Sequence, residues 1–235
     1  MTRTEVAAAI AAAGPGHPVD LSGRSLAGAD LSSLDLAGAD LAHADLYNVR
    51  LVGSDLSGAD LAGARLDLAW LIHTNLAHAN LSGVSMHGPI VAPGMPDIPK
   101  DAPNIAGANF SGAHIIARLN GDAEGANFSH ADLGADLRNQ SMGILRTDFD
   151  NANLRHANFT GANLNYAKMR FADLTGADLK DASLAWADLS GADLKGADLE
   201  GADLAHADLT DVILTGANLK GAKGLGTARG LKRAP

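Results

Sequence analysis

Leucine recurs at every fifth position along residues 172–209, a stretch that reads ADLTG ADLKD ASLAW ADLSG ADLKG ADLEG ADLAH ADL. Alanine stands two positions before each leucine, and an aspartate, or once a serine, separates the two. A period of five fits neither an amphipathic helix, which repeats about every 3.6 residues, nor a plain strand, which alternates about every 2. It fits a short extended step followed by a corner, in which alanine and leucine face one side and aspartate faces the other.

The same spacing organises most of the chain into two uninterrupted blocks. Fourteen central positions run from Leu21 to Met86, and fifteen run from Phe149 to Leu219. Glycine often follows a central residue by two positions. A type II turn requires a positive φ at this point, which glycine adopts without steric cost. We therefore expect many corners of this type, and a different turn at Leu68 and at His73.

Twenty strict A-(D/N)-(L/F) triplets give the chain a resemblance to the pentapeptide-repeat family, which covers about residues 20–222. The resemblance implies an all-β fold: a right-handed quadrilateral parallel β-helix with four pentads to a coil. Residues twenty apart then stack directly, about 4.8 Å from one coil to the next. The central residues should form a thin core, which in the second block includes Leu174, Leu179, Leu184, Leu189, Leu194 and Leu199.

The first residues predict a short capping helix over residues 3–13. Thr2 and Glu5 have the spacing of a capping box, and a Gly-Pro pair follows the helix. The side that carries Val6 and Ile10 should cover the first coil, because an open end exposes unpaired strand edges and apolar side chains. A signal peptide is the alternative, although Glu5 offsets its single arginine and the apolar core is short. We favour the cap and expect a cytoplasmic protein.

The spacing divides the chain into five segments. They are a cap helix and linker (1–19), a first repeat block (20–88), a Pro-rich loop with irregular repeats of the same solenoid (89–148), a second block (149–222) and a basic tail expected to be disordered (223–235). Five of the eight prolines lie within residues 87–104. Proline cannot donate to a strand ladder, so this stretch predicts an extruded loop. Such a loop is either a binding element on a rigid scaffold or a tolerated insertion.

Composition limits the chemistry that the repeat can perform. The net charge of −9 disfavours nucleic acid and anionic membranes as partners, because both select basic surfaces. There is no cysteine, so disulfides and thiolate metal sites are excluded. The repeat accounts for nearly every aspartate, and no nucleophile, histidine and acid converge in this register. We therefore expect no catalysis, no metal and no cofactor.

The first hypothesis for function is a rigid, non-enzymatic scaffold that binds a protein partner. Tyr166, Trp186 and His206 are each twenty residues apart, so they should stack on one outer corner. Aromatic side chains often dominate protein contacts. This corner and the irregular loops are therefore the candidate contact sites, and the oligomeric state stays open.

The family resemblance implies a second hypothesis, since some relatives imitate duplex DNA and bind type II topoisomerases such as DNA gyrase, as inhibitors or in quinolone resistance. Over the whole chain the charge is too low for this, because DNA carries one charge per about 1.7 Å. Locally, ten acids against two lysines leave a net charge of −8 within residues 173–211. The candidate mimicking carboxylates are Asp188, Asp193, Asp198 and Asp208. We favour the scaffold.

Overall fold

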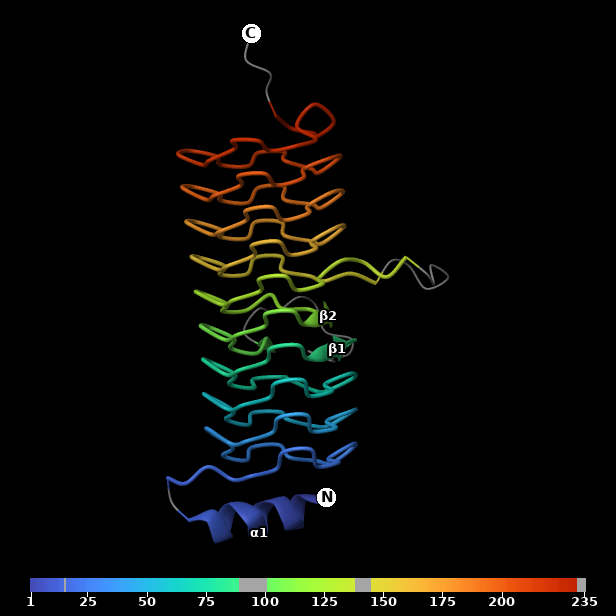
Figure 1. The fold of residues 1–235 in the computed structure, drawn as a ribbon, viewed down its shortest axis with the longest axis vertical. Coiled ribbons are helices and arrows are strands. Elements are labelled where there is room, and N and C mark those ends of the chain that lie inside the picture. The colour runs from blue at the N-terminus through green and yellow to red at the C-terminus, as the bar shows by residue number, and fades with distance from the viewer. Residues whose placement is uncertain (15, 89–100, 138–144, 232–235) are drawn as a thin grey trace.

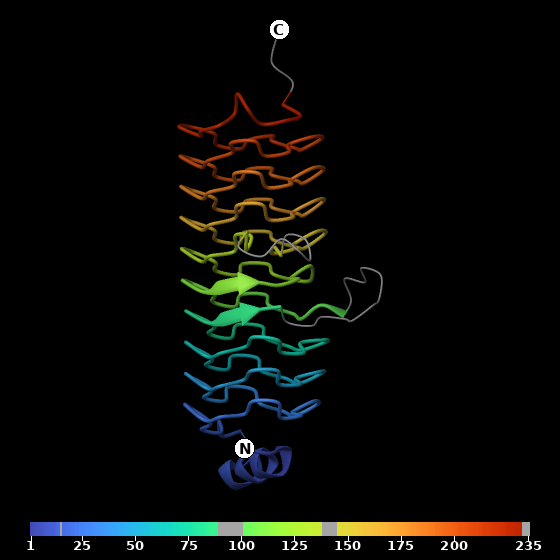
Figure 2. The ribbon, with the colours of Figure 1, turned by 90° about the vertical axis from the view of Figure 1, so that its right-hand side faces the viewer.

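The computed structural model describes residues 1–14, 16–88, 101–137 and 145–231. From residue 20 onward the chain winds into a tall stack of coils, and Figures 1 and 2 show the same narrow outline from two directions at right angles. Neighbouring coils pair in parallel through residues twenty apart, as Asp20 does with Asp40 and Asp188 with Asp208. Twenty residues hold four pentads, so each coil has four sides and the fold is a β-helix.

Each regular pentad satisfies its backbone in the same way. In one example, the Leu41 N–H donates to the Asp60 carbonyl at 2.7 Å, and the His43 N–H donates to the Ala62 carbonyl at 2.8 Å. The Ala44 N–H closes the corner on the Leu41 carbonyl at 3.0 Å. Two bonds therefore tie the pentad to the next coil and one holds its turn, which leaves few backbone groups without a partner.

Extended segments are short because a corner follows every three residues. Nearly all pairings are consequently single bridges. Two strands stand out among the described residues: β1 (Ser85–His87) and β2 (His114–Ile116), which pair in parallel. They lie one above the other on the same side of the stack (Figure 2).

The corners at Leu68 and His73 do not use a different turn, so that expectation is wrong. The φ of His73 is 54°, and the Thr74 N–H closes its turn on the Leu71 carbonyl at 3.1 Å. The φ of Leu68 is 59°, close to the 67° of Gly53, and the Ala69 N–H closes the turn on the Leu66 carbonyl at 3.1 Å. The Leu68 N–H also donates to the His87 carbonyl at 3.0 Å. A different turn would misdirect this N–H, so the bond between coils holds the corner in the left-handed conformation even without glycine.

The core is a column of central side chains. The leucines expected there in the second block are all 0% exposed: Leu174, Leu179, Leu184, Leu189, Leu194 and Leu199. Larger rings fill the irregular coils, where Phe128 stacks between Phe110 and Phe159 with ring centroids 5.0 Å apart on each side. Ala123 takes a central position near Phe128 and donates its N–H to the Asn153 carbonyl. We infer that the phenylalanines occupy volume that alanine leaves.

The irregular region keeps the ladder but changes its spacing. Asn80 pairs with Asn109, Asn109 with Asn127, and Asn127 with Asn158, so the offsets are 29, 18 and 31 residues. Most of the extra length in the first offset is the expected Pro-rich loop, whose residues 89–100 lie outside the described part of the chain. The extra length in the third offset includes an antiparallel bridge between Asp136 and Leu145, and the yellow-green segment there extends away from the stack (Figure 1).

Helix α1 (Arg3–Ala13) covers the first coil. The predicted capping box is present: the Thr2 N–H donates to Glu5 Oε2 at 2.7 Å, and the Glu5 N–H donates to Thr2 Oγ1 at 3.4 Å. Val6 is fully buried, and Ile10 packs against the core. Arg3 Nη1 donates to the Ser32 carbonyl at 2.8 Å, so the helix also satisfies polar groups of the coil that it covers.

The far end differs from the expected disordered tail. Lys223 forms a parallel backbone β-bridge with Asp203, and Arg229 forms one with Asp208. The Arg229 N–H donates to the Ala207 carbonyl at 2.9 Å. Hydrogen bonds to the preceding coil therefore extend the ladder past residue 222. The basic composition alone did not reveal these backbone pairings.

Candidate functional site

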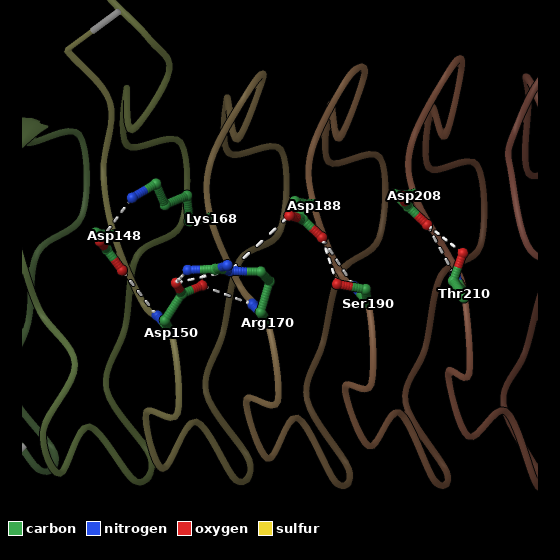
Figure 3. Close-up of polar contacts among 8 residues, drawn as sticks. All are labelled: Asp148, Asp150, Lys168, Arg170, Asp188, Ser190, Asp208 and Thr210. Atoms are coloured by element: carbon green, nitrogen blue, oxygen red, sulfur yellow. Dashed lines mark hydrogen bonds and ion pairs between the residues drawn. The ribbon is translucent and has the colours of Figure 1, made fainter. Parts of the chain in front are cut away.

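The outward aspartates accept hydrogen bonds from the corner that directly follows each of them. Asp188 Oδ1 accepts from the Ser190 N–H at 3.1 Å and from the Ser190 hydroxyl at 2.7 Å, and Asp208 does the same with Thr210 at 3.0 and 2.6 Å (Figure 3). The Thr210 hydroxyl and backbone N–H hold the pKa of Asp208 below its usual range. These donors offset the repulsion between carboxylates that stack on neighbouring coils.

Acidification is expected to destabilise the fold. The pKa of Asp55 is lowered chiefly by the Ser57 backbone N–H, and that of Asp198 chiefly by the Glu200 backbone N–H. Because these folded-state pKa values lie below the unfolded ones, the stabilisation is present above the unfolded pKa and is lost as pH falls through the folded pKa. Thermal melts followed by circular dichroism should show a melting temperature that drops below about pH 4. A melting temperature that rises as the pH falls from about 4 to about 3 would contradict this prediction.

Asp150 fills a gap in this pattern. Lys168 stands where an outward aspartate is usual, so the Arg170 N–H, two positions on, donates instead to Asp150 Oδ1 of the previous coil at 2.8 Å. Arg170 Nε donates to Asp150 Oδ2 at 2.8 Å, and Nη2 pairs with the same oxygen (Figure 3). The bonds to Asp150 raise the pKa of Arg170. Asp150 is only 7% exposed, so it anchors both the backbone and the side chain of Arg170.

A carboxylate of the previous coil also accepts a corner N–H in a Ser-His-Asp cluster. Ser85 occupies the outward position, and the His87 N–H donates to Asp67 Oδ1 of the previous coil at 3.0 Å. Ser85 Oγ lies 3.1 Å and Asp67 Oδ1 lies 2.9 Å from the same ring nitrogen, His87 Nδ1. A hydrolytic triad places the nucleophile and the acid on opposite ring nitrogens. The cluster is therefore built to complete the ladder.

Within residues 1–14, 16–88, 101–137 and 145–231, no group of three or more His, Cys, Asp or Glu is placed to hold a metal ion. Over the same ranges, no helix combines the length and the apolar character needed to cross a bilayer.

The four aspartates proposed for DNA mimicry do not share a face. The backbones of Asp188 and Asp208 pair in a parallel β-bridge, so both residues lie on one side of the stack. Asp193 and Asp198 belong to the next two pentads, which form the next two sides of the four-sided coil. The sequence already contained this information, because residues five apart lie on successive sides.

Cations also accompany three of these carboxylates. Lys195 Nζ lies 2.9 Å from Asp193 Oδ2, and Lys180 Nζ lies 3.0 Å from Asp198 Oδ2. Arg170 Nε lies farther from its partner, 3.9 Å from an Asp188 carboxylate oxygen. The negative charge of the second block is therefore divided among several sides and partly compensated on each.

The predicted aromatic corner exists as a stack. The Tyr166 and Trp186 ring centroids are 6.0 Å apart with planes 6° from parallel, and those of Trp186 and His206 are 4.2 Å apart at 23°. Trp186 is 48% exposed. This corner lies immediately before the side that carries Asp188.

Phe171 marks the opposite corner of that side and was missed from the sequence. Its side chain is 66% exposed and lies over Gly191, where an added Cβ would be 2.5 Å from Phe171 Cδ1. Gly191 follows Asp188 by three residues, so Trp186 and the Phe171 ring flank Asp188 on one coil. An aromatic at a corner position with glycine twenty residues later was the available signal.

We call this surface the aromatic face. It comprises Lys168, Arg170, Asp188, Ser190, Asp208 and Thr210, with the corners at Trp186 and Phe171. The corner residues Tyr166, Phe171 and Trp186 have φ of 63°, 56° and 63°. Left-handed φ is unfavourable for bulky side chains by roughly 1 kcal/mol each. The chain thus holds exposed aromatics at positions where glycine would relieve strain.

These features define a repeat solenoid with one aromatic-lined side, and comparison with known proteins gives its class. The family model described as pentapeptide repeats, in eight copies, matches residues 19–51, 50–88, 146–181 and 182–222, which make up more than half of the 235-residue chain. The chain therefore belongs to the pentapeptide repeat family. No curated protein matches the sequence.

Several solved structures are similar. HetL, a pentapeptide repeat protein involved in heterocyst differentiation regulation in the cyanobacterium Nostoc, is 29% identical over 97% of this chain and 96% of its own, with a TM-score of 0.45. A pentapeptide repeat protein of the Arabidopsis thaliana thylakoid lumen is 38% identical over 42% of this chain and 61% of its own, with a TM-score of 0.36. QnrB1, a plasmid-mediated fluoroquinolone resistance protein, is 21% identical over 85% and 89%, with a TM-score of 0.37.

Proposed function

We propose that the chain, a right-handed four-sided β-helix as its family resemblance implies, is a rigid, non-enzymatic scaffold that binds a protein partner through the aromatic face. The observation that supports this most is the placement of Trp186 and Phe171 on either side of Asp188. Aromatic residues and arginine carry much of the energy of protein contacts, and Arg170 lies on the same side. The coil backbone fixes these side chains in advance, which reduces the entropy lost on binding.

DNA mimicry towards gyrase is the weaker alternative. Duplex DNA presents a dense charge along its surface, one per about 1.7 Å, whereas the candidate carboxylates are divided among three sides. In a supercoiling assay with purified gyrase, we expect no inhibition at a stoichiometric excess of the protein. Inhibition that disappears when Asp188, Asp193, Asp198 and Asp208 are all changed to Asn would favour mimicry instead. A cytoplasmic location stays a prediction.

Site-specific photocrosslinking tests the scaffold directly. A photoreactive phenylalanine analogue is placed at the position of Trp186, and at Asp181 as a control, since both are exposed corners at positive φ. In lysate of the source organism, we expect a discrete protein adduct from position 186 and none from 181. Unlabelled wild-type protein should compete for it, because the partner recognises the folded face.

The competitor variant for this experiment is Trp186→Gly combined with Phe171→Gly. Glycine is common at these corner positions and relieves the left-handed strain, so the fold should persist while competition weakens at least about tenfold. Equal adducts from positions 186 and 181, or undiminished competition by the glycine variant, would show that the aromatic face is not the contact site.

A further inference from the structure

We propose that the aromatic face binds an extended basic segment of the partner protein, with a cationic side chain over Asp188 and Asp208 and apolar side chains against Trp186 and Phe171. This inference rests on the proposed scaffold function and specifies the chemistry of its partner. The charges, the exposed rings and the spacing along one coil each contribute to the argument.

In the coils of the face nearest the N-terminus, positive and negative side chains are paired with each other. Lys168 Nζ lies 3.3 Å from Asp148 Oδ2, and Arg170 forms its closest contacts with Asp150 (Figure 3). The charges of these two pairs largely cancel. A partner charge brought to this part would compete with bonds that already exist, so little net attraction is available there.

The coils of the face nearer the C-terminus, which carry Asp188 and Asp208, keep an excess of negative charge. Arg170 Nε lies 3.9 Å from Asp188 Oδ2 but is bonded to Asp150 at 2.8 Å. Asp208 is held by the hydroxyl and N–H of Thr210, which are neutral donors, and Arg229 pairs with it on the same side in the next coil. Asp188 and Asp208 therefore retain charge on neighbouring coils, which attracts a cationic side chain.

The exposed rings select an inserted side chain over a flat ligand. Tyr166 and His206 stack on opposite faces of the Trp186 ring, so they compete with a base for stacking on Trp186. Nucleic-acid bases bind aromatic residues by stacking on their faces. An aliphatic side chain can pack against the Trp186 edge and the Phe171 ring without displacing the stack.

The spacing along the coil matches an alternating segment. Trp186 lies at the corner and Asp188 on the side that follows it, two residues later, so their Cα atoms are at most about 7 Å apart. The Phe171 ring lies over Gly191, beyond Asp188 on the same coil. In an extended peptide, alternate side chains on one side are about 6.6 Å apart. An apolar-x-basic-x-apolar segment that crosses the face can therefore place one side chain at each of the three positions.

The two tryptophans provide an internal reporter. The chain contains only Trp70 and Trp186, so their indole N–H signals give two resolvable peaks in a nitrogen–proton correlation spectrum. The probe is a peptide in which leucine and lysine alternate with serine, and its counterpart has glutamate for lysine. We expect the lysine peptide to shift the Trp186 signal and leave Trp70 in place, with at least about fivefold weaker binding of the glutamate peptide.

Matched variants locate the contact. Asp188→Asn with Asp208→Asn should weaken the lysine peptide about fivefold, because two exposed charge pairs are lost. Asp173→Asn with Asp193→Asn removes two stacked carboxylates from a different side and should change binding less than about twofold. Phe171→Gly should weaken binding without unfolding the coil. Each result supports the inference.

Equal binding of both peptides, a joint shift of Trp70 and Trp186, or equal losses from the two Asn pairs would overturn it. The two proposals can fail separately. A specific crosslink at position 186 that is unaffected by the Asp188 and Asp208 changes would retain the scaffold and reject the basic segment. Absence of a specific crosslink would reject the scaffold surface itself.

Discussion

Replacing Leu189 with aspartate is expected to lower the free energy of unfolding by at least about 4 kcal/mol. Leu189 is 0% exposed and occupies a central position with coils on both sides. The substitution removes apolar packing and places a carboxylate where no water reaches it. The Leu189 N–H still donates to the Asp208 carbonyl, so the loss arises in the core rather than in the ladder.

Chemical denaturation followed by circular dichroism gives the size of this effect. Leu189→Met conserves volume and should cost less than about 1.5 kcal/mol, and Ser190→Asp places the same charge on the outside. Because a solenoid is stabilised by contacts between neighbours, amide hydrogen exchange should accelerate first in the coils next to residue 189. An unchanged unfolding transition would show that the central positions are assigned wrongly.

The regular blocks could be predicted from sequence because one backbone solution repeats in them. A leucine every fifth residue fixes which side chains face inward, and the twenty-residue offset follows from four pentads per coil. The stack of Tyr166, Trp186 and His206 and the capping of α1 followed from such local rules. The number of pentads in a coil came from the resemblance to the pentapeptide-repeat family, and spacing then placed these features.

The irregular coils were harder because neighbouring coils, rather than local sequence, determine their register. Leu119 and Ala123 both donate their N–H groups to the next coil as central residues do, although they are only four residues apart. Alanine carries no signal for a central position by itself. The carbonyls of Asp148 and Asn153, about thirty residues later, define these positions.

The candidate site was only partly predictable for a related reason. Sequence spacing placed Trp186 on a corner and the stacked aspartates on several faces, but the charge of the second block was counted over all its sides together. The other four phenylalanines occupy buried central positions, whereas Phe171 occupies a corner position of the repeat. The role of Asp150 depends on the missing carboxylate at position 168, a relation between two coils that no local motif displays.

Removing the Asp150 side chain tests that relation and is the second large effect that we expect. Asp150→Ala leaves the Arg170 N–H without its acceptor and breaks the ion pair, which should lower the free energy of unfolding by about 2–3 kcal/mol, since Arg170 remains partly solvated. Asp150→Asn keeps an acceptor oxygen and should recover roughly half of the loss. Asn165 supports this expectation, because its Oδ1 accepts the Ala185 N–H across the same coil step at 3.0 Å.

The matched control for this prediction is Asp208→Ala, which removes an outward carboxylate whose hydrogen bonds stay within its own corner. It should cost about 1 kcal/mol or less, because water can replace the lost acceptor at an exposed Thr210. Urea denaturation of the three variants beside the wild type gives the order. If Asp150→Asn is as damaging as Asp150→Ala, the ion pair rather than the backbone acceptor stabilises this coil. If neither exceeds Asp208→Ala, Asp150 has no special role in joining the coils.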